Sequence, residues 1–133
     1  MTPGQKVKAA RILVIDDEPQ ITEIVEAFLT NAGHNVSVFN DGKKGLTQAT
    51  EVKPDIILLD IMMPDLDGYS ICNDLKNNPS TANIPVVFLT GKDRNDDQGR
   101  SFQAGGDMYI KKPFSCERLL EIVNIILMST GRH

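Results

Sequence analysis

The chain has 133 residues, a formal net charge of −4, 41% hydrophobic residues and 24% charged residues, which is the composition of a single globular domain. Its acidic balance disfavours direct binding to nucleic acid, which requires a basic face. No apolar run is long enough to span a membrane, and residues 1–10 lack the apolar centre of a signal peptide. We therefore expect a cytoplasmic protein in which Cys72 and Cys116 are reduced thiols that fill core space in helices.

The first half of the chain alternates strand and helix patterns. Unbroken apolar runs are typical of buried strands, whereas apolar residues three and four positions apart are typical of a helix with one buried face. These patterns predict, in order, a flexible lead-in over 1–10, a strand over 11–15, a helix over 19–31, a strand over 35–39, a helix over about 41–51 and a strand that ends at Asp60. Gly33 follows the first helix, and Pro54 breaks the chain before the third strand.

The second half continues the alternation. The patterns predict a helix over 68–77, a polar loop over 77–83, a strand that opens at Pro85 and ends at Thr90, a helix over 93–104, a short strand over 108–110 and a helix over about 115–129. The helix over 93–104 is the weakest, because Phe102 is its one large apolar residue and Gly99 costs about 1 kcal/mol relative to alanine. Ser115 is a suitable N-cap for the last helix.

The last helix contains more apolar residues than one buried face needs: Leu119, Leu120, Ile122, Val123, Ile125, Ile126, Leu127 and Met128. Either it is buried on two sides, or part of its surface contacts another molecule. Five strands that alternate with five helices through short connections predict an α/β fold, with a parallel sheet covered on both faces.

Polar residues whose side chains can take part in catalysis or binding stand at the ends of four predicted strands. Asp16-Asp17-Glu18 follow the first strand, Asp60 and Thr90 close the third and fourth, and Lys112 follows the fifth. Because the carboxyl ends of parallel strands meet at one edge of a sheet, these side chains should converge. Each has an ordinary explanation alone, such as a solvated turn, a local hydrogen bond or a solvent-facing lysine. Together they supply what phosphoryl transfer needs: a carboxylate that attacks, hydroxyl and ammonium donors, and negatively charged carboxylates that can bind a metal ion.

The predicted cluster of carboxylates also indicates a metal site. Two carboxylates ~4 Å apart repel each other by roughly 4 kcal/mol at an effective dielectric constant near 20. A cluster of Asp16, Asp17 and Asp60 therefore needs a cation, or some of its members must remain protonated. Oxygen ligands without cysteine or histidine favour Mg²⁺, with Mn²⁺ as the second choice.

At these residues the chain resembles the receiver domain of two-component response regulators. The matching segments are 13–18, 60–68, 85–90 and 109–114, and the resemblance extends over about 11–128, with 129–133 as a C-terminal tail. It implies a flavodoxin-like, doubly wound (βα)5 fold with the strand order 2-1-3-4-5. It also implies that Asp60 accepts a phosphoryl group from a histidine kinase or a histidine phosphotransfer protein.

The resemblance assigns further roles around the phosphoacceptor. Asp17, Asp60 and the backbone carbonyl of Met62 would hold Mg²⁺, and Asp16 would support it through water. Lys112, which stands directly before Pro113, would contact the phosphoryl oxygens, and the bond between these two residues is expected to be cis.

Switching and turnover follow from the same resemblance. Thr90 and the N–H of Gly91 would bind the phosphoryl group, while Tyr109 turns inward as Thr90 moves. Met62 and Lys92 occupy the positions that tune hydrolysis. An apolar residue at 62 cannot orient an attacking water, so hydrolysis should be slow to moderate, with a phosphoryl half-life longer than seconds.

The resulting hypothesis is a signalling switch rather than an enzyme with an external substrate. The face made by the fourth helix, the fifth strand and the fifth helix would control an unknown output protein or domain, and could also form a homodimer. The main alternative is an interaction module that works without phosphate. A haloacid dehalogenase-type phosphatase would need an acid where Met62 stands. A flavodoxin-type electron carrier would need a hydroxyl- and glycine-rich loop in place of Asp16-Asp17-Glu18.

Overall fold

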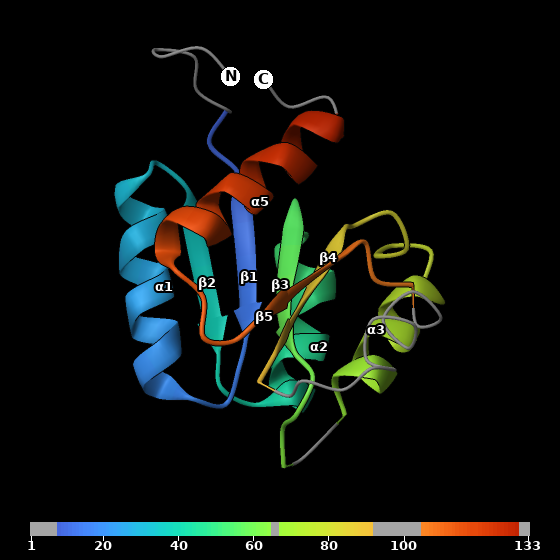
Figure 1. Cartoon of the computed structure of the whole chain (residues 1–133). Coiled ribbons are helices and arrows are strands. Elements are labelled where there is room, and N and C mark those ends of the chain that lie inside the picture. The colour runs from blue at the N-terminus through green and yellow to red at the C-terminus, as the bar shows by residue number, and fades with distance from the viewer. Residues whose placement is uncertain (1–7, 65–66, 92–104, 131–133) are drawn as a thin grey trace.

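Five parallel strands form one sheet in the order β2-β1-β3-β4-β5, which confirms the expected flavodoxin-like topology (Figure 1). The computed structural model describes residues 8–64, 67–91 and 105–130. In chain order the elements are β1 (Arg11–Ile15), α1 (Pro19–Asn31), β2 (Asn35–Phe39), α2 (Gly42–Val52), β3 (Ile56–Asp60), α3 (Gly68–Lys76), β4 (Val86–Thr90), β5 (Met108–Lys111) and α5 (Cys116–Ser129). The helix predicted over 93–104, for which the label α4 is kept free, lies outside the described residues.

The central strands are the most deeply buried part of the sheet. Every residue of β3 and β4 is buried, as are four of the five residues of β1, whereas the edge strand β2 is only half-buried. The unbroken apolar runs in the sequence reflect helices packing on both faces of these strands. The prediction that Pro85 opens the fourth strand is wrong by one residue. Proline has no N–H for the ladder, and only the Pro85 carbonyl takes part, accepting a hydrogen bond from the Ile57 N–H at 3.0 Å.

Side-chain caps determine where three helices begin. Asp41 accepts from the Lys44 N–H at α2, Asp67 accepts from the Tyr69 N–H at α3, and Ser115 accepts from the Arg118 N–H at α5. The cap at Ser115 confirms the prediction for the last helix, while α3 ends one residue earlier than expected.

The sheet separates two apolar cores. One face packs against α1 and α5 through Val25, Leu29, Leu119, Val123 and Leu127, among others. The other face packs against α2 and α3, as Figure 1 shows. Burial against the sheet therefore accounts for most of the apolar residues of α5, but Ile125 remains 51% exposed and Met128 38% exposed.

Both cysteines are free thiols in helices, but only Cys72 fills core space. Cys116 is the first residue of α5 and is half-buried, so the prediction that it fills the core is wrong.

Among the described helices, none combines the length and the hydropathy needed to cross a membrane.

Gly68 permits the close approach of α3 to the end of β3. Its N–H donates to the Ile61 carbonyl at 2.8 Å, and a Cβ at this position would lie 2.4 Å from the Asp60 carbonyl oxygen and 2.7 Å from the Ile61 Cα. Alanine is intrinsically the better helix residue, so any loss in Gly68→Ala is steric. We expect the free energy of unfolding to fall by about 2 kcal/mol, measured by urea denaturation.

The matched control for this substitution is Gly91→Ala, because a Cβ at Gly91 would meet no atom of the described residues within 4 Å. The control should leave the urea midpoint nearly unchanged. Equal midpoints for the two variants would contradict the tight approach at Gly68.

Candidate functional site

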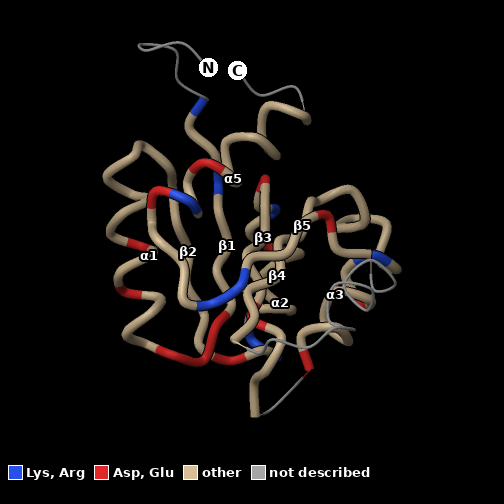
Figure 2. The backbone as a smooth tube through the Cα atoms, in the orientation of Figure 1, with Lys and Arg blue, Asp and Glu red and all other residues tan. Residues whose placement is uncertain are grey.

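The polar strand ends predicted from the sequence lie at one edge of the sheet. Asp16 and Asp17 follow β1, Asp60 and Thr90 end β3 and β4, and Lys112 follows β5. In Figure 2 the acidic segment after β1 and the basic segment after β5 lie at this edge. The parallel register that pairs β1 with β3, and β3 with β4, brings these ends together although they are far apart in the chain.

Four carboxylates form the centre of the site. One side-chain oxygen from each of Asp16, Asp17, Glu18 and Asp60 can be chosen so that all four lie within 4.8 Å of one another. Asp16 and Asp60 are buried, with residue exposures of 0% and 3%, while the other two are half-buried. Buried charges of one sign require a compensating cation. The oxygen-only donor set and its spacing fit a hard divalent ion such as Mg²⁺.

The environment of Asp60 opposes its ionisation. Burial, followed by the negative charge of Asp16, raises the pKa of Asp60 to about 7, although Lys112 and the Met62 N–H act in the opposite direction. The Met62 N–H donates to Asp60 Oδ1 at 3.3 Å. A cation in the cluster would favour the ionised, nucleophilic form of the carboxylate.

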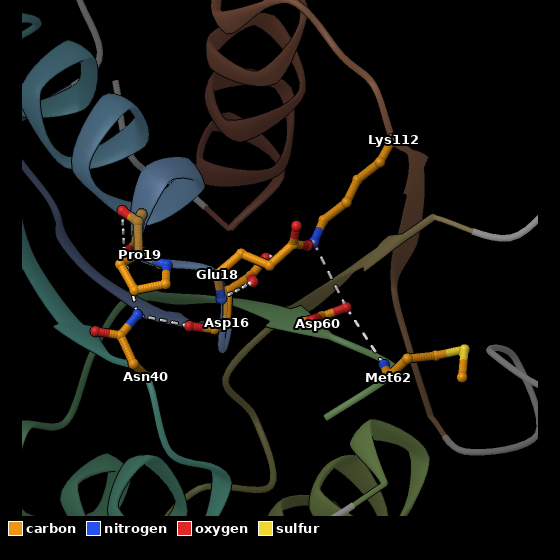
Figure 3. A network of polar contacts seen from close by, with 8 residues as sticks. Asp16, Glu18, Pro19, Asn40, Asp60, Met62 and Lys112 are labelled. Carbon is orange, nitrogen blue, oxygen red and sulfur yellow. Dashed lines mark hydrogen bonds and ion pairs between the residues drawn. The ribbon is translucent and has the colours of Figure 1, made fainter. Parts of the chain in front are cut away.

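Lys112 supplies the positive charge in the described structure. Its Nζ lies 2.7 Å from Asp16 Oδ2, 2.7 Å from Glu18 Oε1 and 3.7 Å from Asp60 Oδ1 (Figure 3). Burial opposes its charged form, but the contacts with Asp16 and Glu18 outweigh burial and raise the pKa of Lys112. Its backbone N–H donates to the Thr90 carbonyl at 2.6 Å, and the Lys112–Pro113 bond is cis, as the resemblance implies.

The remaining predicted residues surround this centre to different extents. Thr90 is buried at the end of β4 and Gly91 is exposed directly after it. Tyr109 is half-buried in β5, opposite Phe88 in the register, and the Met62 side chain is 49% exposed beside Asp60. Lys92, predicted to tune hydrolysis, lies outside the described residues.

Two residues of the site were missed by reasoning from the sequence. In the sequence Glu18 is only the third residue of an acidic run, but in the structure its carboxylate accepts from the Lys112 ammonium at 2.7 Å. Asn40, directly after β2, donates from Nδ2 to the Asp16 carbonyl at 2.7 Å (Figure 3) and to Thr22 Oγ1 at 3.1 Å, which ties the end of β2 to the end of β1 and to α1. The position of Glu18 next to Asp17 was a signal for proximity, whereas nothing local in the sequence marks Asn40.

A cavity of about 420 Å³ opens beside the site. Glu18, Gly91 and Lys112 line its polar part. The rest is lined by residues of α1, of the connection between β5 and α5, and by the first residue of α5: Ile21, Ile24, Val25, Pro113, Phe114 and Cys116. Ile24 is 59% exposed, so this apolar surface continues onto the outer face of α1.

The raised pKa of Asp60 predicts how the stability of the metal-free protein depends on pH. The folded protein keeps this proton up to about pH 7, whereas the unfolded chain loses it near 3.8. The contribution of Asp60 is therefore fully present below pH 3.8 and is lost as the pH rises to about 7. We expect wild type to lose on the order of 3 kcal/mol across this window relative to Asp60→Asn.

Urea unfolding in EDTA at pH 4.5 and pH 7.5 measures this difference. A gap between the two proteins that does not change with pH would contradict the raised pKa. Saturating Mg²⁺ should reduce the pH dependence, because the ion offsets the repulsion among the carboxylates.

Comparisons with known proteins identify relatives of this chain. A family model described as the response regulator receiver domain matches residues 12–124. The DNA-binding dual master transcriptional regulator RpaA of Synechocystis is 41% identical over 92% of this chain and 51% of its own length. Protein PilG of Pseudomonas aeruginosa is 39% identical over 87% of this chain and 86% of its own length. The chain thus spans about half of RpaA and most of PilG.

Solved structures agree with the sequence relatives. A response regulator structure from Chloroflexus aurantiacus superimposes with a TM-score of 0.85 at 30% identity, covering 91% of this chain and 99% of the other. The BeF3-activated N-terminal receiver domain of Klebsiella pneumoniae RstA superimposes with a TM-score of 0.81 at 30% identity, covering 88% and 97%.

Proposed function

Since this chain belongs to the receiver domains of response regulators, we propose that it accepts a phosphoryl group on Asp60 and acts as a phosphorylation-dependent switch. The donor is a phosphohistidine of a histidine kinase or of a histidine phosphotransfer protein. The observation that supports this role most strongly is the convergence of Asp60 with Asp16, Asp17 and Lys112 at one edge of the sheet.

In the proposed reaction, a carboxylate oxygen of Asp60 attacks the phosphorus atom of the donor. A new O–P bond forms, the P–N bond of the phosphohistidine breaks, and the imidazole nitrogen leaves with the electron pair of that bond. The protein contributes placement, because β3 holds Asp60 rigidly and the neighbouring Met62 N–H orients one of its oxygens.

The acidic residues are assigned to the metal. Asp17, Asp60 and the Met62 backbone carbonyl would hold Mg²⁺, and Asp16 would support it through water. When bound there, the ion would neutralise charge on the transferring group. The burial of Asp16 and Asp60 supports this assignment, because it leaves the two carboxylates in need of a cation.

Donors on the other side of the site are assigned to the phosphoryl oxygens. Lys112 is 3.7 Å from Asp60 and needs only a small movement to contact the incoming group. Thr90 and the Gly91 N–H would bind it from the end of β4. Movement of Thr90 would let Tyr109, half-buried on the neighbouring strand, turn inward. Met62 and Lys92 would tune hydrolysis, and the apolar Met62 side chain cannot orient an attacking water.

The output side of the proposal involves the face that includes β5 and α5. The exposed Ile125 and Met128 of α5 provide apolar surface for a partner, an output domain or a second copy of the chain. The phosphoryl group adds about −1.5 to −2 charge units, and attraction of Thr90 toward that charge would bias this face between two states.

The direct test is incubation with acetyl phosphate, followed by intact mass measurement. We expect one phosphoryl adduct with Mg²⁺ and none in EDTA. Absence of an adduct under both conditions, together with no binding of beryllofluoride, would instead support an interaction module that works without phosphate.

A further inference from the structure

Glu18 has no role in the phosphoryl transfer described above, but among the described residues it makes one of the two shortest ion pairs of the Lys112 ammonium. The ammonium is 2.7 Å from Glu18 and from Asp16, and 3.7 Å from Asp60. We propose that Glu18 is a positioning residue that holds the Lys112 ammonium back from Asp60 and competes with the phosphoryl group for it. This inference rests on the proposed function.

The two short contacts of Lys112 differ in how easily they can be broken. The Asp16 side chain is 0% exposed. Water therefore cannot take the place of the ammonium at this carboxylate unless the end of β1 moves. The Glu18 side chain is 44% exposed and can turn into solvent. Ion pairs with an exposed partner are weak because water competes for both charges. Glu18 is therefore the partner that Lys112 releases.

The backbone of Glu18 is fixed, so the release involves only its side chain. Its N–H donates to Asp16 Oδ1 at 3.0 Å, and its carbonyl accepts from the N–H groups of Ile21 and Thr22 in the first turn of α1. The carboxylate can swing into solvent without disturbing Asp16 or the start of the helix.

Phosphorylation would change the balance at Lys112. The new group adds about −1.5 to −2 charge units and three acceptor oxygens next to Asp60. Figure 3 shows that the Glu18 carboxylate and the Asp60 carboxylate lie in different directions from the ammonium. Movement of Nζ toward Asp60, to close the 3.7 Å gap, thus lengthens the contact with Glu18. Before phosphoryl transfer, the ion pair with Glu18 opposes the movement of the Lys112 ammonium toward Asp60. After transfer, this ion pair breaks.

The test compares three variants that separate the contact from the charge. Glu18→Gln removes the charge, Glu18→Asp keeps the charge but withdraws the carboxylate by one methylene, and Glu23→Gln makes the same charge change at an exposed position of α1. The readout is the affinity for beryllofluoride, a phosphoryl analogue, titrated at saturating Mg²⁺ and followed by NMR.

We expect Glu18→Gln and Glu18→Asp to bind the analogue about two- to fivefold more tightly than wild type, a size typical of an exposed ion pair, and Glu23→Gln to bind like wild type. If Glu18→Asp behaves as wild type while Glu18→Gln gains affinity, only the charge matters and the positioning role is wrong. Weaker binding in both Glu18 variants would show that Glu18 prepares Lys112 for the phosphoryl group, which also overturns the proposal.

The side-chain ¹⁵N resonance of Lys112 gives a second readout that a merely structural role would not move. In free Glu18→Gln this resonance should shift toward its position in analogue-bound wild type, and an unshifted resonance would contradict the proposal. Calorimetric titration with Mg²⁺ alone tests whether Glu18 is instead a metal ligand. A tenfold loss of Mg²⁺ affinity in Glu18→Gln, without a gain for the analogue, would make Glu18 a metal ligand instead.

The outcomes for the two proposals are distinguishable. If wild type binds no analogue and forms no phosphoryl adduct, the proposed function fails and the role of Glu18 fails with it. If wild type binds the analogue and the Glu18 variants bind it equally well, only the role of Glu18 fails.

Discussion

Asp60→Asn is expected to abolish phosphoryl labelling while the domain stays folded. The amide has nearly the same shape as the carboxylate but lacks a nucleophilic oxygen, so no acyl phosphate can form. Removal of the negative charge also relieves repulsion from Asp16, and burial no longer opposes an ionised group, so the variant should be more stable than wild type at pH 7.5 in EDTA. Intact mass after acetyl phosphate treatment and urea unfolding measure the two effects.

The control for this prediction is Asp74→Asn, the same chemical change at an exposed position of α3. It should be labelled as wild type is. Persistent labelling of Asp60→Asn would move the phosphoacceptor to another residue, with Asp16 and Asp17 as the first candidates because their oxygens lie in the same cluster.

The second large effect is expected from Asp17→Ala, which should lower Mg²⁺ affinity at least about tenfold in calorimetric titration. Its carboxylate belongs to the cluster but is only half-buried, so its removal should disturb the metal site more than the fold. Asp16→Ala would be a poorer test. It would also remove the acceptor for the Glu18 N–H and the buried partner of Lys112.

Asp74→Ala is the matched control variant for the metal titration. It removes one carboxylate far from the cluster in sequence and should leave the Mg²⁺ affinity unchanged. Unaltered Mg²⁺ binding by Asp17→Ala would refute its role as a ligand. If labelling by acetyl phosphate also survived in that variant, the metal-dependent part of the proposed reaction would have to be revised.

The sheet was predictable because its central strands leave a simple signature. Burial on both faces requires residues such as Ile56 to Leu59 and Val86 to Leu89 to be apolar without interruption, so those strands could be located from the sequence. Local chemistry also located the start of α5, where Ser115 caps the helix. The boundary at Pro85 was misplaced because a proline before a strand still offers its carbonyl to the ladder.

The site was predictable to the level of which residues converge, but not of which residues pair. Topology alone brings the ends of β1, β3 and β5 together, and that was sufficient to expect Lys112 near the acidic group. Whether its ammonium contacts Asp16, Glu18 or Asp60 depends on side-chain conformations. The three distances from Nζ to the carboxylate oxygens lie between 2.7 and 3.7 Å, a difference of only 1 Å. The helical pattern likewise placed Cys116 in a helix but could not determine its depth below the surface.

The complete burial of β3 and β4 has a consequence for how the protein opens. Backbone amides in the core strands of a domain typically exchange with solvent hydrogen only through global unfolding, so we expect the Asp60 amide to be among the slowest to exchange in the described part of the chain. Charge repulsion at its carboxylate cannot be relieved by local fraying. Any ligand that neutralises this edge of the sheet should therefore raise the melting temperature of the entire domain rather than rigidify one loop.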